Sequence, residues 1–249
     1  MDIKKQRYTI PDMIRGLSLI SMLLYHAMWD IVYIHGADIP WYRSQGAFIW
    51  QQSICWTFIL LSGFCCSMGR HKLKRSLTML ICSCIVSGVT LIFMPSSRIL
   101  FGILTLIGTG MLLMIPLEKL FKKPDPYISA AVCFLLFLLT RHIGRGEIGL
   151  GQNIFFTLPK EIYADYITAY LGFPPDDFIS YDYFPVLPWV LLYFCGFFIY
   201  RIIEKQNITE KLSVIGCKPL EFLGRHSLFI YMIHQPVIYG ILYIVFAFV

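Results

Sequence analysis

His26 and Asp30 are the two residues of this chain whose types and spacing most directly suggest chemistry. In a helix, a separation of four residues places both side chains on one face, one turn apart. A carboxylate directed at one imidazole nitrogen fixes the tautomer and raises the basicity of the other nitrogen. The pair is therefore a candidate general base. A buried polar pair that ties its helix to neighbouring helices is an equally good interpretation.

Further polar side chains lie inside or beside apolar segments, where ionisable groups are costly and often functional. They are His35, Gln51, Gln52, Asp182, His234 and Gln235. His35 follows the first apolar segment and is interpreted either as a solvated loop residue or as a second catalytic candidate. Together with His26 and Asp30, the others would bring polar groups from four segments to the outer half of a helix bundle. There Gln51, Gln52 or His234 could hydrogen-bond an oxyanion.

Basic side chains gather at the opposite ends of these segments. Asp12 and Arg15 lie one turn apart near the start of the first segment, and residues 70–75 contain four Lys or Arg. Arg225, His226 and Ser227 begin the last segment, where backbone N–H groups of a helix start would point at a bound anion. Phosphate binding is one interpretation. Anchoring to anionic lipid is the other, and it is the stronger one for residues 70–75.

Composition indicates which class of protein must position these residues. Hydrophobic residues make up 57% of the 249 residues, charged residues only 14%, and mean hydropathy is +0.66. Such a chain has too little polar surface for a soluble domain and belongs in a membrane. Its net charge of +6 comes from basic residues beside apolar segments, which indicates membrane orientation and no nucleic-acid partner.

Several enzyme classes have no support in the sequence. The eight cysteines mostly lie inside apolar segments without a CxxC pair, so we expect neither a disulfide framework nor a metal site. The chain contains no GxSxG, HExxH or phosphate-binding glycine loop. Hydrolase, metalloprotease and nucleotidase activities are therefore not predicted.

Hydropathy predicts an all-α, polytopic membrane helix bundle of about seven spans in a single domain, residues 1–249. The spans are Pro11–Ile34, Ala47–Gly69, Ser76–Met94, Arg98–Pro116, Pro126–Thr140, Phe184–Ile203 and Phe222–Phe248. The fifth is short. An external loop, residues 141–183, follows it and could hold a re-entrant or interfacial segment at 164–173. Its acidic and aromatic residues could contact a sugar or form an interfacial belt.

The distribution of basic residues predicts an N-terminus inside and a C-terminus outside. Most Lys and Arg, including Lys4, Lys5, Arg7 and those of residues 70–75, fall on the side that this orientation makes cytoplasmic. That bias is what the positive-inside rule requires. The predicted location is the cell membrane, as a multi-pass protein of a bacterial inner or plasma membrane surrounded by lipid. A homo-oligomer remains possible.

Three stretches together resemble the catalytic-domain family of heparan-α-glucosaminide N-acetyltransferase and its bacterial relatives. They are Asp12-Met-Ile-Arg-Gly-Leu-Ser-Leu-Ile-Ser-Met-Leu-Leu-Tyr-His26, Asp182-Tyr-Phe-Pro-Val-Leu-Pro-Trp189 and Leu223-Gly-Arg-His-Ser-Leu-Phe-Ile-Tyr-Met-Ile-His-Gln-Pro236. The resemblance covers nearly the whole chain. It implies a membrane enzyme that takes acetyl-CoA from the cytoplasm and delivers acetyl to an amino sugar or other glycan on the far side.

The resemblance also bears on individual residues. The family's catalytic histidine lies near the position of His35, and a family asparagine important to catalysis falls near His26. We favour His26 as the base because Asp30 supports it. The expected acetyl-CoA contacts are Arg15, Arg225, His226 and Ser227; the expected acceptor contacts are Gln51, Gln52, Asp182, Trp189, His234 and Gln235.

Two questions of mechanism and function stay open in the sequence. The acetyl group could pass directly to the acceptor, or first to a histidine and then to the sugar. A proton-coupled or solute carrier is a rival function for a small bundle with a central histidine and aspartate. A non-catalytic partner in polysaccharide export is a third. The identity of the acceptor is not encoded in any feature of the sequence that we recognise.

Overall fold

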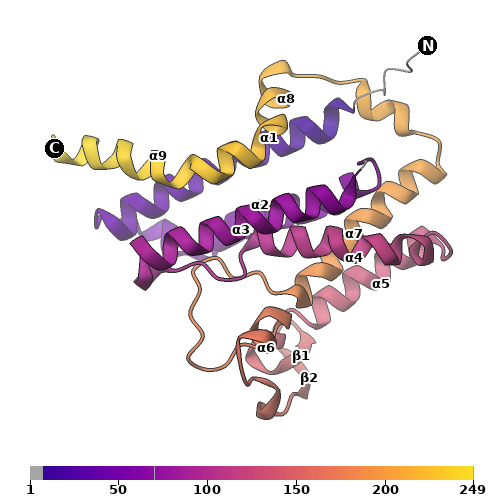
Figure 1. Ribbon diagram of the computed structural model, residues 1–249, viewed down its shortest axis with the longest axis horizontal. Helices are drawn as coiled ribbons and strands as arrows, with labels where there is room; N and C mark the ends of the chain where they lie inside the picture. The colour runs from indigo at the N-terminus through magenta and orange to yellow at the C-terminus, as the bar shows by residue number, and fades with distance from the viewer. Residues whose placement is uncertain (1–7, 70, 249) are drawn as a thin grey trace. The chain divides into compact units, whose positions relative to one another are not determined.

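The computed structural model describes residues 8–69 and 71–248 (Figure 1). The chain falls into two compact units. Met1–Phe58 with Gln206–Val249 form the first unit, and Ile59–Lys205 form the second. Four of the basic residues used to predict orientation, Lys4, Lys5, Arg7 and Arg70, lie outside the described residues.

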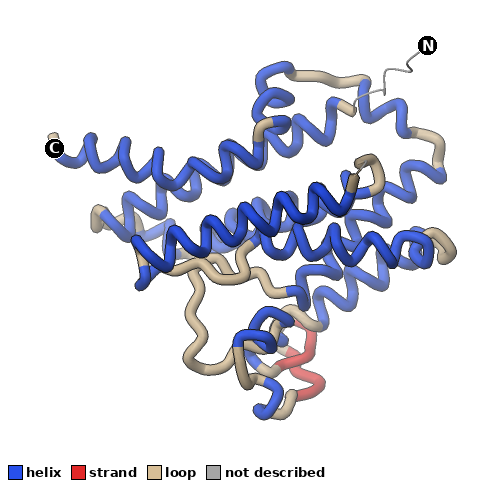
Figure 2. Tube along the Cα trace, in the orientation of Figure 1, coloured by secondary structure: helices blue, strands red, loops and turns tan. Residues whose placement is uncertain are grey.

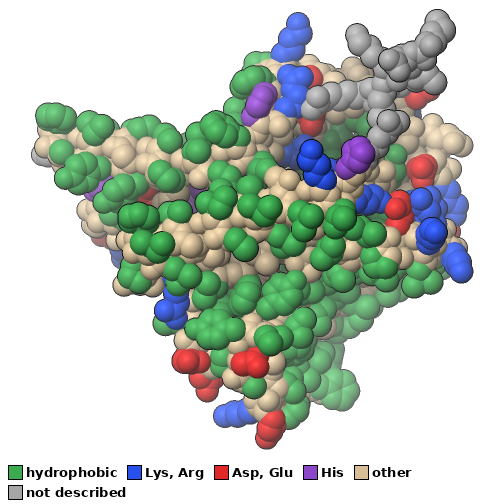
Figure 3. Space-filling model, viewed as in Figure 1, with side chains coloured by type: hydrophobic (Ala, Val, Ile, Leu, Met, Phe, Trp, Pro, Cys, Tyr) green, Lys and Arg blue, Asp and Glu red, His purple; other side chains and the backbone are tan. Residues whose placement is uncertain are grey.

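Helices dominate both units (Figure 2), which confirms the predicted all-α class. Within the described residues, seven helices are long and apolar enough to cross a membrane. They are Thr9–Ile34, Gln45–Cys66, Lys72–Phe93, Ile103–Phe121, Pro126–Arg145, Val186–Lys205 and Ser227–Ala247. Figure 3 shows hydrophobic side chains over the visible faces of the long helices, as expected where lipid surrounds them. The orientation of the termini stays a prediction.

The first unit is built around helix α1 (Thr9–Trp29), which continues into a π-helical turn, Asp30–Ile34. A 3₁₀ turn, Pro40–Arg43, leads into α2 (Gln45–Cys66), whose first part belongs to this unit. Another 3₁₀ turn, Thr209–Ser213, precedes the short helix α8 (Lys218–Arg225) and the long helix α9 (Ser227–Ala247).

Two glycines let α1 and α8 cross with their backbones in close contact. A Cβ atom at Gly16 would overlap the carbonyl oxygen of Leu220, and one at Gly224 would overlap the carbonyl oxygen of Asp12. Small residues at crossings are the usual way in which membrane helices approach closely. This packing gives Gly224, within the Gly-Arg-His-Ser stretch, a structural purpose that the sequence did not reveal.

The start of the last span differs from the prediction. A single helix from Phe222 was expected, but α8 ends at Arg225 and α9 begins at Ser227. The ring of His226 caps the end of α8, because its Nδ1 lies 2.8 Å from the carbonyl oxygen of Phe222. The helix break therefore falls within the Arg225-His226-Ser227 stretch, and the apolar helix that the stretch was expected to begin starts at Ser227.

The second unit packs helices in pairs: α3 (Lys72–Phe93) against α4 (Ile103–Phe121), and α5 (Pro126–Leu139) against α7 (Val186–Lys205). The second part of α2 crosses α7 at Gly63 and Gly196, where Cβ atoms would overlap the carbonyl oxygens of Tyr193 and Leu60. The fourth span begins at Ile103 rather than at Arg98, and it continues past Pro116.

Residues 141–183 contain regular structure that the sequence analysis missed. Strands β1 (Glu147–Leu150) and β2 (Asn153–Thr157) form an antiparallel hairpin, drawn red in Figure 2, with an irregularity between Ile148 and Gly149. The suspected interfacial segment is the short helix α6 (Tyr166–Leu171), which Asp165 caps at its start. Three 3₁₀ turns, at Pro95–Ser97, Ile143–Arg145 and Lys160–Ile162, complete the connections of this unit.

Candidate functional site

Asp30 is the centre of a polar cluster between α1 and α9. Its side chain is fully buried, and its Oδ1 accepts a hydrogen bond of 2.7 Å from Nε2 of Gln235. Because a buried carboxylate needs hydrogen-bond donors, this contact offsets part of the cost of burying Asp30. The last span therefore supplies the partner of the carboxylate that the first span buries.

The structure shows no hydrogen bond between the side chains of Asp30 and His26, which were predicted to act as a pair. Asp30 opens the π-helical turn, in which the backbone N–H of His35 bonds the Asp30 carbonyl oxygen at 3.0 Å. The Asp30 carboxylate hydrogen-bonds Gln235 and interacts electrostatically with the His35 ring. The backbone N–H of Asp30 still bonds the His26 carbonyl oxygen, so the two residues keep their i, i+4 register, but the Asp30 carboxylate finds its hydrogen-bond donor on α9.

His26 instead lies beside a second histidine. The ring centroids of His26 and His234 are 4.8 Å apart, and the two rings are tilted by 58°. His234 is buried, and its Nδ1 lies 2.5 Å from the carbonyl oxygen of Tyr231. Because a carbonyl can only accept, Nδ1 bears the proton, and Nε2 of the neutral ring keeps its lone pair.

His35 completes the cluster. Its ring stacks on Phe246 of α9, with centroids 4.2 Å apart and an interplanar angle of 10°. Four buried polar atoms of this cluster have no hydrogen-bond partner within the described part of the chain. They are Asp30 Oδ2, His35 Nε2, His234 Nε2 and Gln235 Oε1. Buried polar groups in proteins are nearly always bonded, so this concentration suggests a place prepared for a polar ligand.

Tyr42 borders this region and was not identified from the sequence, where nothing distinguishes it from the other tyrosines. It is buried, packs with Val32 and Ala47, and donates a hydrogen bond of 2.8 Å to the backbone carbonyl of Tyr25. Burial raises the pKa of the Tyr42 hydroxyl well above its usual range. Tyr42 therefore stays a neutral donor that fixes the chain after the π-helical turn.

The glutamines predicted to contact substrate lie on α2. The side chains of α2 that pack on α1 include Trp50 and Ile54, and Trp50 Nε1 donates to Ser21 Oγ at 2.8 Å. Gln52 accepts a hydrogen bond of 3.2 Å from Trp56 on its own helix. The roles of Gln51 and Gln52 stay predictions.

Asp182 and Trp189 belong to the second unit and have local partners there. Asp182 Oδ2 accepts from the backbone N–H of Ile103 at 3.3 Å and so caps the start of α4. The Trp189 ring packs on Phe137 and Phe184, with centroids 5.4 and 4.9 Å apart. These contacts give both residues a structural purpose, and their predicted contact with the acceptor is untested.

The residues predicted to hold acetyl-CoA lie around the crossing of α1 and α8. Arg15 Nη1 is 3.1 Å from Oδ1 of Asp12, so much of its charge is already neutralised. Arg225 is exposed at the end of α8, and Ser227 is half-buried at the start of α9. Arg225 is thus better available to an incoming phosphate than Arg15 is.

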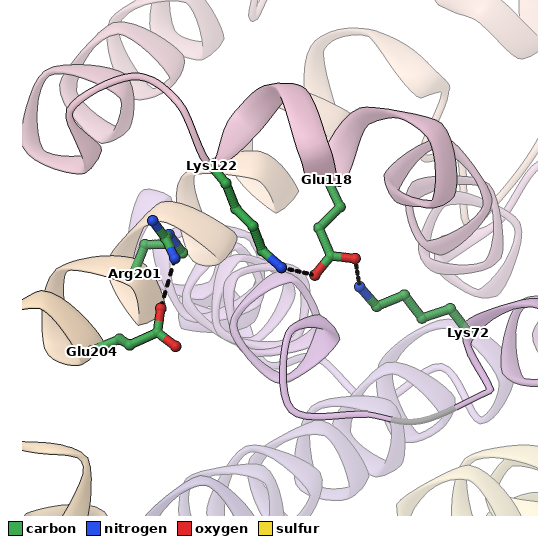
Figure 4. A network of polar contacts seen from close by, with 5 residues as sticks. All are labelled: Lys72, Glu118, Lys122, Arg201 and Glu204. Atoms are coloured by element: carbon green, nitrogen blue, oxygen red, sulfur yellow. Dashed lines mark hydrogen bonds and ion pairs between the residues drawn. The ribbon is translucent and has the colours of Figure 1, made fainter.

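The basic stretch at residues 70–75 is also partly neutralised. Lys72 Nζ lies 2.5 Å from Oε2 of Glu118, and Lys122 reaches the other oxygen of that carboxylate at 3.1 Å (Figure 4). Lys72 therefore forms an ion pair within the second unit. This contact favours the structural interpretation of the stretch over phosphate binding.

Comparison with known proteins gives one match. The family model for the catalytic domain of heparan-alpha-glucosaminide N-acetyltransferase matches residues 7–236. No curated protein and no solved structure matches the chain. The matched range includes the whole polar cluster around Asp30 except the Phe246 ring.

Proposed function

Because the chain belongs to the heparan-alpha-glucosaminide N-acetyltransferase catalytic family, we propose that it transfers acetyl from acetyl-CoA to an amino sugar or related glycan. The donor would bind from the cytoplasm, and the acceptor would bind on the other side of the membrane. The observation that carries the proposal is the buried group of unpartnered atoms on Asp30, His35, His234 and Gln235. An acyl transfer needs a proton acceptor and an oxyanion donor side by side. The unpartnered atoms would supply the acceptor, and the His26 ring beside His234 could supply the donor.

We assign the proton acceptor to His35 rather than to His26. The reason for favouring His26 was support from Asp30, but the Asp30 carboxylate accepts its hydrogen bond from Gln235 and lies within electrostatic range of His35. A carboxylate near His35 stabilises the imidazolium that forms when the acceptor amine or hydroxyl loses its proton. The family resemblance also places the catalytic histidine near His35.

The two other histidines would act on the substrates by hydrogen bonding. His234 has its proton on Nδ1, so its Nε2 can accept a hydrogen bond from the acceptor. The half-buried ring of His26 lies against it and could donate to the thioester carbonyl as that oxygen becomes negative. Attack on the thioester would break the carbon–sulfur bond and release CoA. An acetyl-histidine intermediate is the alternative route.

Purified protein in lipid nanodiscs, given acetyl-CoA labelled in the acetyl group and glucosamine as the probe acceptor, tests the proposal. The expected result is labelled acetylated sugar together with an equal amount of free CoA. Uptake of glucosamine into liposomes without any CoA release would instead identify a carrier. If a panel of amino sugars yields neither product nor CoA above the protein-free rate, the acetyltransferase proposal is wrong.

A further inference from the structure

A groove lined by charged side chains opens at one end of the second unit. It has a volume of about 470 Å³ and lies between the connection from α4 to α5 and the end of α7. Its charged lining consists of Lys123, Asp125, Arg201, Glu204 and Lys205. Three cations face two carboxylates, which leaves the lining with an excess of one positive charge.

Ion pairs within the lining show which donors remain available. Lys205 Nζ lies 2.5 Å from Asp125 Oδ2, and its hydrogen bond lowers the pKa of that carboxyl, so Asp125 stays ionised. Arg201 Nη1 pairs with Glu204 at 2.8 Å (Figure 4). Among the described residues, Lys123 has no ion-pair partner, and the buried Nε of Arg201 has no acceptor. An anion in the groove would meet the ammonium of Lys123 and the accessible part of the Arg201 guanidinium, because both side chains line it.

A second groove, of about 580 Å³, continues from the first and shares Lys123 and Pro124 with it. Its other lining is almost entirely apolar and comes from α4, α5 and α7: Leu120, Phe121, Ile128, Val132, Cys133 and Phe198. Along α5, the lining advances five residues from Ile128 to Cys133, which is about 7.5 Å at 1.5 Å per residue. That length matches several methylene groups of an acyl chain.

We propose that the two grooves together bind one anionic phospholipid, with its phosphate at Lys123 and Arg201 and an acyl chain along α5. Both grooves lie on a membrane-spanning unit, and they meet where α4 ends and α5 begins, so a lipid of the adjacent leaflet reaches them without leaving the bilayer. The excess positive charge selects an anionic headgroup, as basic pockets between spans do. A free phosphate would leave the apolar groove unoccupied.

Native mass spectrometry of the detergent-purified protein, titrated with palmitoyl-oleoyl phosphatidylglycerol, tests this site. One resolved lipid adduct should form. Lys123→Glu should weaken the lipid affinity about 10-fold or more, because it replaces an attractive charge with a repulsive one. Lys160→Glu is the matched control, because it makes the same charge change at an exposed residue outside both grooves.

The apolar groove has its own pair of variants. Val132→Trp should fill the groove and weaken binding severalfold, whereas Val89→Trp, at a similarly exposed valine of α3, should not. Glycerol 3-phosphate should not displace the lipid. If Lys123→Glu and Lys160→Glu weaken binding equally, general charge attraction explains the binding and the lipid site is disproved. If Val132→Trp has no effect and glycerol 3-phosphate displaces the lipid, the groove is a simple anion site and the lipid site is likewise disproved.

Discussion

Gln235 in the middle of α9 donates a hydrogen bond of 2.7 Å to the carboxylate of Asp30, where α1 gives way to a π-helical turn. The contact joins residues that are 205 positions apart in the sequence. It also holds the two elements from which the unpartnered atoms of the cluster come. The integrity of the site should therefore depend on this one amide.

Gln235→Leu should lower the thermal midpoint of the purified protein. Leucine has a similar volume but no donor, so Asp30 would stay buried without its partner, at a cost of about 1.5–3 kcal/mol. Thermal unfolding in detergent, followed by tryptophan fluorescence, measures the change. Gln45→Leu is the control, because Gln45 is exposed at the start of α2. An unchanged midpoint for Gln235→Leu would show that the contact contributes nothing to stability.

His35→Ala should reduce acetyl transfer by roughly 10²–10⁴-fold, the range expected when a general base is removed. Asp30→Asn keeps an oxygen for Gln235 and should preserve the thermal midpoint while still slowing the reaction. His26→Ala should retain more activity than His35→Ala. The measurement is single-turnover acetyl transfer at saturating acetyl-CoA. An inactive His26→Ala beside an active His35→Ala would return the base to His26.

Gly224→Ala should destabilise the protein through the crossing of α1 and α8. Its methyl group would overlap the Asp12 carbonyl, and such overpacking typically costs about 1–3 kcal/mol. Gly240→Ala is a matched control in α9, because nothing lies within 4 Å of a Cβ atom there. That change should be neutral or slightly stabilising, since alanine is the better helix former. Equal thermal midpoints for the two variants would contradict the close crossing.

The helices and their number could be predicted from the sequence because hydropathy and length decide whether a segment spans a membrane. The break at His226 could not, because Phe222 and Leu228 on either side are equally apolar and a ring-to-carbonyl bond ends α8. The hairpin at Glu147–Thr157 was missed for a related reason. Its strands are short, and no change in residue composition separates them from the helical span that they follow.

The candidate site was predictable in its residue types but not in its pairings. His26, Asp30, His35, His234 and Gln235 were all identified as polar groups in or beside apolar segments, and the structure brings them together. Sequence spacing suggested that Asp30 serves His26. In the structure Asp30 instead accepts its hydrogen bond from Gln235 of α9, 205 positions away, and no local pattern records such a tertiary contact.

Reporter fusions test the predicted orientation. A fusion after Val249 should report an external C-terminus, because seven spans separate it from the N-terminus, which is predicted to lie inside. A fusion near Lys211 should report the cytoplasm, because basic residues favour the inner side. Paired alkaline phosphatase and green fluorescent protein fusions give opposite outputs on the two sides. A cytoplasmic C-terminus would mean that one of the seven helices does not cross.

Each substrate should enter the protein from its own side of the membrane. CoA is multiply negative and cannot cross hydrocarbon. The exposed Arg225 lies at the end of α8, in the segment that the charge bias makes cytoplasmic. In sealed vesicles of known orientation, acetyl-CoA on the cytoplasmic face and glucosamine on the other should give product, and the reversed arrangement should not.

Arg225→Ala should raise the donor KM about 10-fold or more, if one charge-assisted phosphate contact of about 1.5–3 kcal/mol is lost. Arg43→Ala should leave the donor KM unchanged, because Arg43 is exposed, lies 3.8 Å from Asp38 and is predicted to be external. Equal product with both substrates confined to the cytoplasmic face would rule out transfer across the membrane, even if acetyl transfer itself were observed. An unaltered donor KM in Arg225→Ala would instead move the phosphate contacts to another part of the inner surface.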